Sequence, residues 1–234
     1  MVLVVAATAV GKPLTRGGCG PRRHPPTLVG SRTLIYGVKR AYEGLRWFPE
    51  TVYFACLRPR GPGIELGVDG PVLEEYGKAG TTDGFSIAGT FAAAHVSQGG
   101  ASYSGCTKYQ GPNCSSIPTA WIAVVDVRTR RRANVPVPYF NTPVIITPGT
   151  PPINDYHNLP LALSANAALA WLQPTRPGSY QLWATTLQPE GATRFTPSPT
   201  MIDTGNIDPS ALRFISGRTL RWTNNGVPHQ MTLT

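Results

Sequence analysis

A strand–turn–strand pattern that recurs along the chain constrains the fold more than any other feature of the sequence. Leu163–Trp171 consists of a short apolar run, a tight turn and a second run that ends in an aromatic residue. The pattern recurs in Leu28–Tyr36 and Phe214–Trp222, and Ser86–Ala94 is a degenerate copy. The aligned turn residues are small or tolerate a positive φ; they are Ser31, Gly89, Asn166 and Gly217. This recurrence predicts an internal repeat in an all-β protein.

The spacing of these copies predicts the size of the repeated unit. Without the long loops, each unit has roughly 40–50 residues, the size of a four-stranded propeller blade. A single unit cannot bury both of its faces, so the units must stack. About four units fit the chain. The sequence therefore predicts a propeller-like array of about four antiparallel blades, either closed or open and incomplete, with a β-sandwich as the alternative.

The composition agrees with many short strands joined by turns. The 234 residues include 25 Gly and 24 Pro, and only 14% are charged. Ala120–Val127 is the strongest predicted strand, and because it is apolar on both faces we expect it to be central. Residues 69–83 are expected to form a connector. The five tryptophans stand mostly in predicted strands, which is typical of core residues; they are Trp47, Trp121, Trp171, Trp183 and Trp222.

The N-terminal residues suggest a processed segment. Met1–Val10 is apolar, and Ala7–Ala9 fits a cleavage site between small residues. Ten apolar residues are too few to span a bilayer, and no other stretch is long enough for a transmembrane helix. We interpret residues 1–18 as a truncated signal segment with an extended lead-in, the alternative for the apolar run being a buried strand. Residues 19–234 form the predicted single domain of a secreted or cell-surface protein.

The four cysteines are compatible with two disulfides. Cys106 and Cys114 bracket a polar loop that a disulfide would close, and Cys19 would then pair with Cys56. The alternative is four free thiols in a cytosolic protein. No Cys-x-x-Cys spacing occurs, so neither a zinc cluster nor any other metal or cofactor is predicted.

Several segments of the chain resemble a known group of proteins. These segments are Ile87–Gly89, Ile122–Arg130, Ile207–Leu212, Ser216–Trp222 and Val227–Leu233. Across roughly residues 19–234 the chain is similar to uncharacterised secreted β-propeller-like proteins of high-GC bacteria. The resemblance implies a blade-repeat fold and brings no catalytic residues with it.

The predicted ligand contacts lie mainly in two long loops, residues 97–119 and 138–158. Tyrosine rings that stand beside Asn and Gln are common in surfaces that hold sugars or peptides. The candidate contacts in these loops are Tyr103, Tyr109, Tyr139, Tyr156 and His157.

Basic residues follow the strongest predicted strand. The cluster consists of Arg128, Arg130, Arg131 and Arg132. It could dock an anionic polymer such as an envelope glycan, or it could simply keep a hairpin tip soluble. The net charge of +9 is not accompanied by a nucleic-acid-binding motif, so nucleic acid is disfavoured as a partner.

No catalytic set can be assembled from the sequence. We therefore predict a non-catalytic binding or scaffold protein whose partner is an envelope glycan or protein. The alternatives are a hydrolase acting on a glycan or peptide and a structural member of a larger surface assembly. For the hydrolase, the residues to consider are Asp126, His157 and Asp203; Asp126 is otherwise expected to cap the arginine-rich turn.

Overall fold

The computed structural model describes residues 19, 26–42, 45–59, 61–70, 78–100, 119–137, 159–176 and 178–234. These residues form sixteen strands and one short 3-10 helix, η2 (Pro209–Ala211). The prediction of an all-β protein is confirmed. Within the described part of the chain, no helix has the length and apolarity that crossing a membrane requires.

The first sheet is an antiparallel meander in which the strands follow one another in chain order. Its strands are β1 (Pro26–Val29), β2 (Thr33–Tyr42), β3 (Leu45–Leu57) and β4 (Ile64–Asp69). β4 lies at the edge of this sheet. The three-stranded sheet near the C-terminus has the same meander order; it consists of β14 (Arg213–Ser216), β15 (Thr219–Asn224) and β16 (Val227–Thr232).

The central sheet has nine strands and combines two meanders. The first comprises β5 (Lys78–Ala88), β6 (Phe91–Gly100), β7 (Thr119–Asp126) and β8 (Arg132–Pro136). The second comprises β9 (Leu161–Ser164), β10 (Ala168–Arg176), β11 (Ser179–Glu190) and β12 (Arg194–Pro197). β13 (Thr200–Gly205) lies off this meander and pairs with β11. A parallel bridge between β8 and β12 joins the two meanders. The end strands β5 and β9 contact each other, so the sheet is nearly closed and barrel-like.

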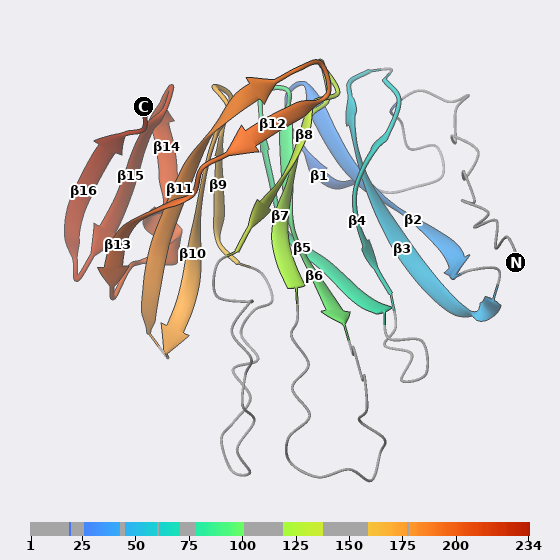
Figure 1. The fold of residues 1–234 in the computed structure, drawn as a ribbon, viewed down its shortest axis with the longest axis horizontal. Helices are drawn as coiled ribbons and strands as arrows, with labels where there is room; N and C mark the ends of the chain where they lie inside the picture. The colour runs from blue at the N-terminus through green and yellow to red at the C-terminus, as the bar shows by residue number, and fades with distance from the viewer. Residues whose placement is uncertain are drawn as a thin grey trace, which may run out of the picture.

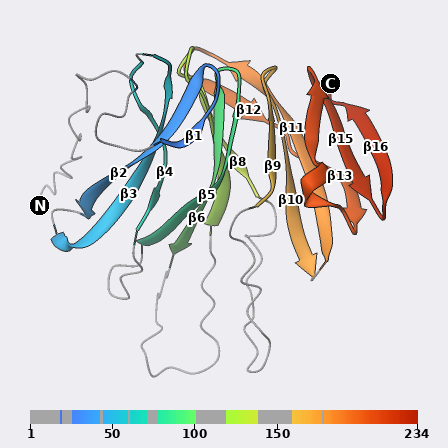
Figure 2. The ribbon, with the colours of Figure 1, turned by 180° about the vertical axis from the view of Figure 1, so that it is seen from behind.

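The strands form four layers, which are β1–β4, β5–β8, β9–β13 and β14–β16 in chain order. An apolar core lies between each neighbouring pair of layers. Ile35 and Leu66 of the first sheet pack against Ala94 of the second layer. Ile122 and Trp171 belong to the core inside the nearly closed sheet, and β10, β11 and the C-terminal sheet enclose the third core. β2 and β3 lie at one end of the stack and β16 at the other (Figures 1 and 2). This arrangement confirms the β-class but not a four-bladed propeller.

The predicted turns form the tips of four hairpins. Gly89 and Gly217 have φ values of 58° and 50°, and each is the first residue of a two-residue loop, as in type II′ turns. In the β9–β10 hairpin the positive φ of 58° falls on Ala167 rather than on Asn166. Asn225 and Gly226, with φ values of 52° and 78°, form the type I′ turn between β15 and β16.

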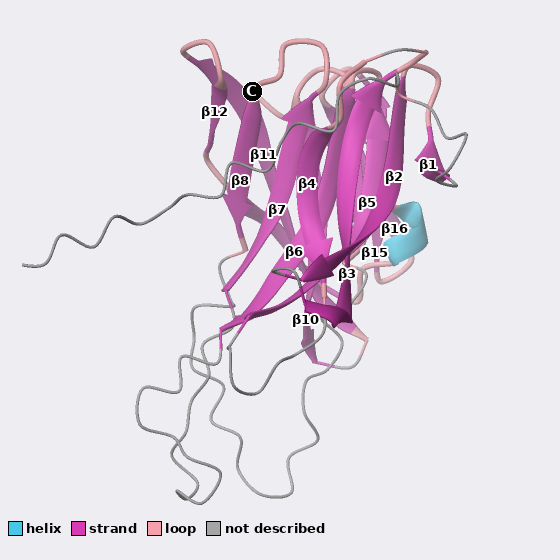
Figure 3. Cartoon of the chain, turned by 90° about the vertical axis from the view of Figure 1, so that its right-hand side faces the viewer, coloured by secondary structure: helices cyan, strands magenta, loops and turns pink. Residues whose placement is uncertain are grey.

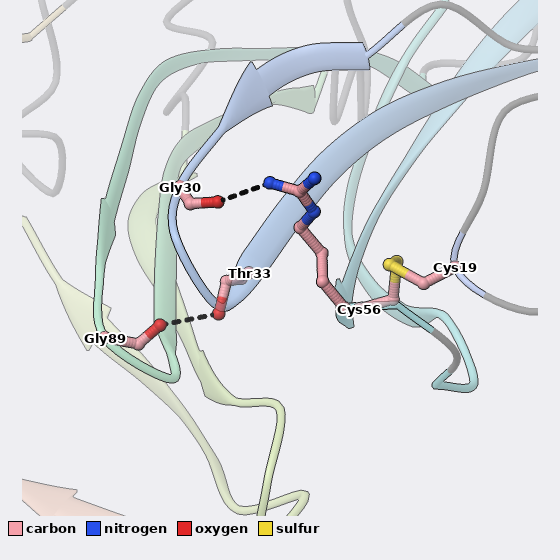
Figure 4. The surroundings of a disulfide bond; sticks show 6 residues. Cys19, Gly30, Thr33, Cys56 and Gly89 are labelled. Carbon is pink, nitrogen blue, oxygen red and sulfur yellow. Dashed lines mark hydrogen bonds between the residues drawn. A yellow bond between two sulfur atoms is a disulfide. The ribbon is translucent and has the colours of Figure 1, made fainter.

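Successive hairpin tips contact one another along one end of the molecule. The Thr33 hydroxyl donates a 2.8 Å hydrogen bond to the carbonyl of Gly89 (Figure 4). A Cβ at Gly89 would lie 3.0 Å from the Cβ of Ala165, the next tip along. Ser164 donates a hydrogen bond to the carbonyl of Gly217 in the fourth hairpin. We call this line of turns the tip row; loops gather at the same end in Figure 3.

One segment differs from the sequence-based prediction, and a second agrees with it. The predicted connector at residues 69–83 is partly a strand, because β5 begins at Lys78. The predicted central strand is present as β7, which pairs with β6 and β8 and has buried side chains on both faces.

Candidate binding groove between β4 and β8

A cavity of about 310 Å³ lies beside the free edge of β4. It extends over the face of the second layer that is turned toward the first sheet. We call it the β4–β8 groove. It has a floor on β7 and β8, a wall formed by β4, and an end formed by Glu50, Gly70 and Gly80.

The floor consists of side chains that share one face of β7 and β8. Trp121 and Ala123 are two residues apart on β7, and Asn134 lies directly opposite Ala123 on β8. Because side chains alternate between the faces of a strand, Arg132 is on the same face as Asn134. Arg132 and Asn134 are exposed, and Trp121 is half-buried. The first sheet therefore leaves this side of the second layer open.

The wall lies close to the second layer because one of its residues is glycine. A Cβ at Gly67 would come within 2.5 Å of the Thr82 hydroxyl oxygen and 2.8 Å of Val96 Cγ2. Any side chain at this position would push β4 away from β5 and β6. A register shift in the β3–β4 pairing sets Gly67 opposite Tyr53 and Glu65 opposite Phe54, with Leu66 between them.

Charged groups stand on both sides of the groove. Glu65 on β4 is exposed. Glu50, whose side chain is only 7% exposed, forms an ion pair with the exposed Arg40 on the neighbouring strand. Arg132 and the Asn134 amide belong to the floor. The groove thus combines a wall that carries a carboxylate with a floor that carries an aromatic ring, an amide and a guanidinium.

Arg128 and Arg130 lie in the β7–β8 turn and do not line the groove. The expected cap is present: Asp126 accepts hydrogen bonds from the Arg128 amide at 3.1 Å and the Thr129 hydroxyl at 2.7 Å. Arg130 has a φ of 63°. Asp126 thus holds a turn in which Arg128 and Arg130 are exposed.

Asp203 joins the third and fourth layers. Its carboxylate accepts hydrogen bonds from the Trp222 indole at 2.7 Å and the Asn224 amide at 3.0 Å. Burial alone would raise the pKa of Asp203, but these hydrogen bonds, helped by the nearby His229, lower it below its ordinary value. Neither Asp203 nor Asp126 lines the groove, so the groove does not bring these two hydrolase candidates together.

A buried histidine–aspartate pair occurs on β5 and β6. His95 is fully buried, and its Nδ1 lies 2.9 Å from a carboxylate oxygen of Asp83 on the paired strand. This pair is internal to the second layer and does not line the groove.

The structure pairs Cys19 with Cys56, the pairing that the sequence predicts (Figure 4). Their Cα atoms are 5.6 Å apart. Both cysteines are buried and pack with Leu34 on the outer face of the first sheet. The other predicted site residues lie outside the described residues; they are Cys106, Cys114, Tyr103, Tyr109, Tyr139, Tyr156 and His157.

The sequence predicts only part of the groove. Arg132 belongs to the predicted arginine cluster, whereas Trp121 is predicted to be a core residue and Glu65 and Asn134 are not among the predicted contacts. One signal for an exposed face was present in the sequence. In Arg132–Pro136, polar or proline residues alternate with apolar ones. In the structure the polar and proline residues are exposed and the apolar residues are buried.

Comparison of the chain with protein-family models, curated proteins and solved structures gave no match. Among the described residues, no group of three or more His, Cys, Asp or Glu side chains is placed to hold a metal ion. The geometry of the groove therefore carries the functional argument.

Proposed function

We propose that this chain is a non-catalytic binding protein that holds its ligand in the β4–β8 groove. The observation that carries the proposal is the cavity over Trp121, with Glu65 on one side and Arg132 with Asn134 on the other. Small-ligand and peptide sites typically combine an apolar or aromatic surface with a few polar groups that fix orientation. An envelope glycan or protein is the partner class that suits a surface of this kind.

We further propose that the protein is secreted and that its four meanders are structural repeats in an open, propeller-like array. The Cys19–Cys56 disulfide and the apolar residues at the N-terminus support an oxidising compartment. The repeats are supported by four hairpins whose tips contact one another in chain order. The loop residues Tyr103, Tyr109, Tyr139, Tyr156 and His157 are proposed as additional ligand contacts.

The candidate carboxylates are held by other parts of the protein, which favours binding over hydrolysis. Asp126 accepts hydrogen bonds within the β7–β8 turn, and Asp203 accepts hydrogen bonds from Trp222 and Asn224. Within the groove, Glu50 is engaged by Arg40. A glycoside hydrolase requires two carboxyl groups that face one substrate. Of the two groove carboxylates, Glu65 is the one without an ion pair among the described residues, so the groove offers one such group rather than two.

Retention of the full chain on mixed arrays of glycans and synthetic peptides tests this function. Asn134→Trp fills the floor of the groove, and Gln230→Trp adds the same ring on the exposed strand β16, away from the groove. We expect Asn134→Trp to abolish retention and Gln230→Trp to leave it unchanged. Equal retention by both variants would refute a site in the groove. Turnover of a retained ligand that is lost in Glu65→Gln would favour the hydrolase instead.

A further inference from the structure

We infer that the β4–β8 groove accepts an extended peptide, which pairs with β4 and becomes the fifth strand of the first sheet. This inference rests on the proposed function and specifies its ligand. Peptides that add a strand to an exposed sheet edge gain affinity from backbone hydrogen bonds and specificity from alternate side chains.

The first requirement is a free strand edge, which β4 provides. It pairs with β3 on one side, and the described sheet has no strand on the other side. The edge is bounded at its C-terminal end by β5, because the amide of Gly70, just beyond β4, donates a 3.0 Å hydrogen bond to the Gly80 carbonyl. Unpaired amides and carbonyls along such an edge are a template for another chain. The groove lies along this edge, because Glu65, Leu66, Gly67 and Val68 all line it.

The second requirement is a surface for the added strand to cover. Neighbouring strands lie about 4.8 Å apart and packed sheets about 10 Å apart. β4 already contacts β6 and β7 of the second layer. The next strand position beyond β4 therefore lies above β7 and β8, where Trp121, Ala123 and Asn134 form the floor. One added strand would cover the part of the second layer that the first sheet leaves open.

The charge of the edge indicates which peptides it accepts. Glu65 is exposed on β4, and opposite charges on adjacent strands stabilise their pairing. A second copy of β4 would bring another acidic strand, with Glu65 and Asp69, to this edge, so like charges disfavour self-pairing. The ligand is thus a segment in which apolar residues, which face Trp121 and Ala123, alternate with basic residues near Glu65.

The experiment uses the full chain and an acetylated, amidated hexapeptide in which valine and lysine alternate. Its matched control has the same sequence, with alternate backbone amides N-methylated so that one edge cannot donate hydrogen bonds. Binding is followed by chemical-shift changes in the protein during titration up to millimolar peptide. We expect saturable binding of the unmethylated peptide at the resonances of β4, β7 and β8. We expect at least about tenfold weaker binding of the methylated one, because several backbone hydrogen bonds are lost.

Three protein variants locate the binding. Asn134→Trp should abolish it, while Gln230→Trp should not change it. Glu65→Lys should reverse the charge preference, so that a valine–glutamate peptide binds about threefold more tightly than the valine–lysine peptide. This reversal distinguishes two causes of binding. If general attraction to the basic protein were the cause, the glutamate peptide would bind more tightly even before the substitution. If a charge contact with Glu65 is the cause, the preference changes only with the substitution.

Equal binding of the methylated and unmethylated peptides would overturn the inference, as would the absence of peptide binding at millimolar concentration. If an oligosaccharide binds instead and Asn134→Trp abolishes that binding, strand addition is refuted while the proposed binding function stands. If nothing on the arrays depends on the groove, the proposed function fails as well.

Discussion

The hydroxyl of Thr33 lies 2.8 Å from the carbonyl oxygen of Gly89, although the two residues are 56 positions apart in the chain. Thr33 is fully buried and begins β2, while Gly89 forms the next hairpin tip. Further along the row, the Arg218 guanidinium donates to the carbonyl of Asn166 at 3.1 Å. Hydrogen bonds between tips therefore help to align the first layer with the second and the third layer with the fourth.

Thr33→Val should destabilise the protein. Valine keeps the shape of threonine but leaves the Gly89 carbonyl without this donor, which costs about 1–2 kcal/mol. Urea unfolding monitored by tryptophan fluorescence measures the change in the free energy of unfolding. The control is Thr219→Val, which removes an exposed hydroxyl pair with Thr232 and should change stability by less than about 0.5 kcal/mol. Equal effects of the two substitutions would contradict a structural role for the Thr33 bond.

Ala167→Gly should stabilise the protein. Ala167 has a φ of 58°, a conformation that costs an L-residue about 1–2 kcal/mol and glycine almost nothing. After subtraction of the extra entropy that glycine gains in the unfolded chain, a net gain of about 0.5 kcal/mol is expected. Ala165→Gly, in the same loop but without a positive φ, should instead destabilise by a similar amount. Thermal unfolding compares the two, and a loss of stability in both variants would argue against relief of strain at Ala167.

Asp203→Asn should make stability less dependent on acidic pH. Because the folded-state pKa of Asp203 is lowered, its carboxylate stabilises the fold above the ordinary aspartate pKa, and this contribution is lost as the pH falls through the folded-state value. At pH 6 the variant should be less stable by about 1 kcal/mol, because a neutral amide is the weaker acceptor for the Trp222 indole.

The measurement for Asp203 is the difference in unfolding free energy between the two proteins from pH 6 to pH 2. This difference should shrink below about pH 4, where the carboxyl group of the unfolded chain binds a proton. Asp208, whose pKa is also lowered by hydrogen bonds from Ser210, is present in both proteins and cancels. A difference that stays constant with pH would show that charge is not the cause.

Replacement of both Cys19 and Cys56 by serine should lower stability by about 4 kcal/mol, the loop-closure estimate for a sequence separation of 37. Peptide mapping of the native protein without reductant should recover the two cysteines in one linked fragment. The same map tests the predicted Cys106–Cys114 pair. Recovery of Cys19 and Cys56 as free thiols would exclude the disulfide and remove one support for secretion.

Local turn chemistry made much of the fold predictable from sequence. The backbone at Gly89 and Gly217 adopts positive φ values that favour glycine, and apolar runs on either side form the strands. The strand β7 was predictable because a residue sequence that is apolar on both faces needs a layer on each side. The Ala167 turn was mislocated by one residue, because the neighbouring Asn166 is the better intrinsic left-handed former.

The groove was not predictable by the same means. Trp121 resembles every other strand tryptophan in the sequence, yet it is half-buried, because the first sheet ends at β4. Glu65 and Asn134 are far apart in the chain and meet only through the offset between two layers. That offset depends on long-range packing, including the close approach of Gly67 to Val96. A local sequence pattern carries no information about such packing.

The tip row has an evolutionary consequence. It places contacts between successive hairpins at one pole, whereas the strand ends that precede and follow residues 101–118 and 138–158 lie at the opposite pole. Insertions and deletions at that far pole would leave the alignment intact. Descendants of such a chain can therefore vary in length there while inheriting one unchanged scaffold.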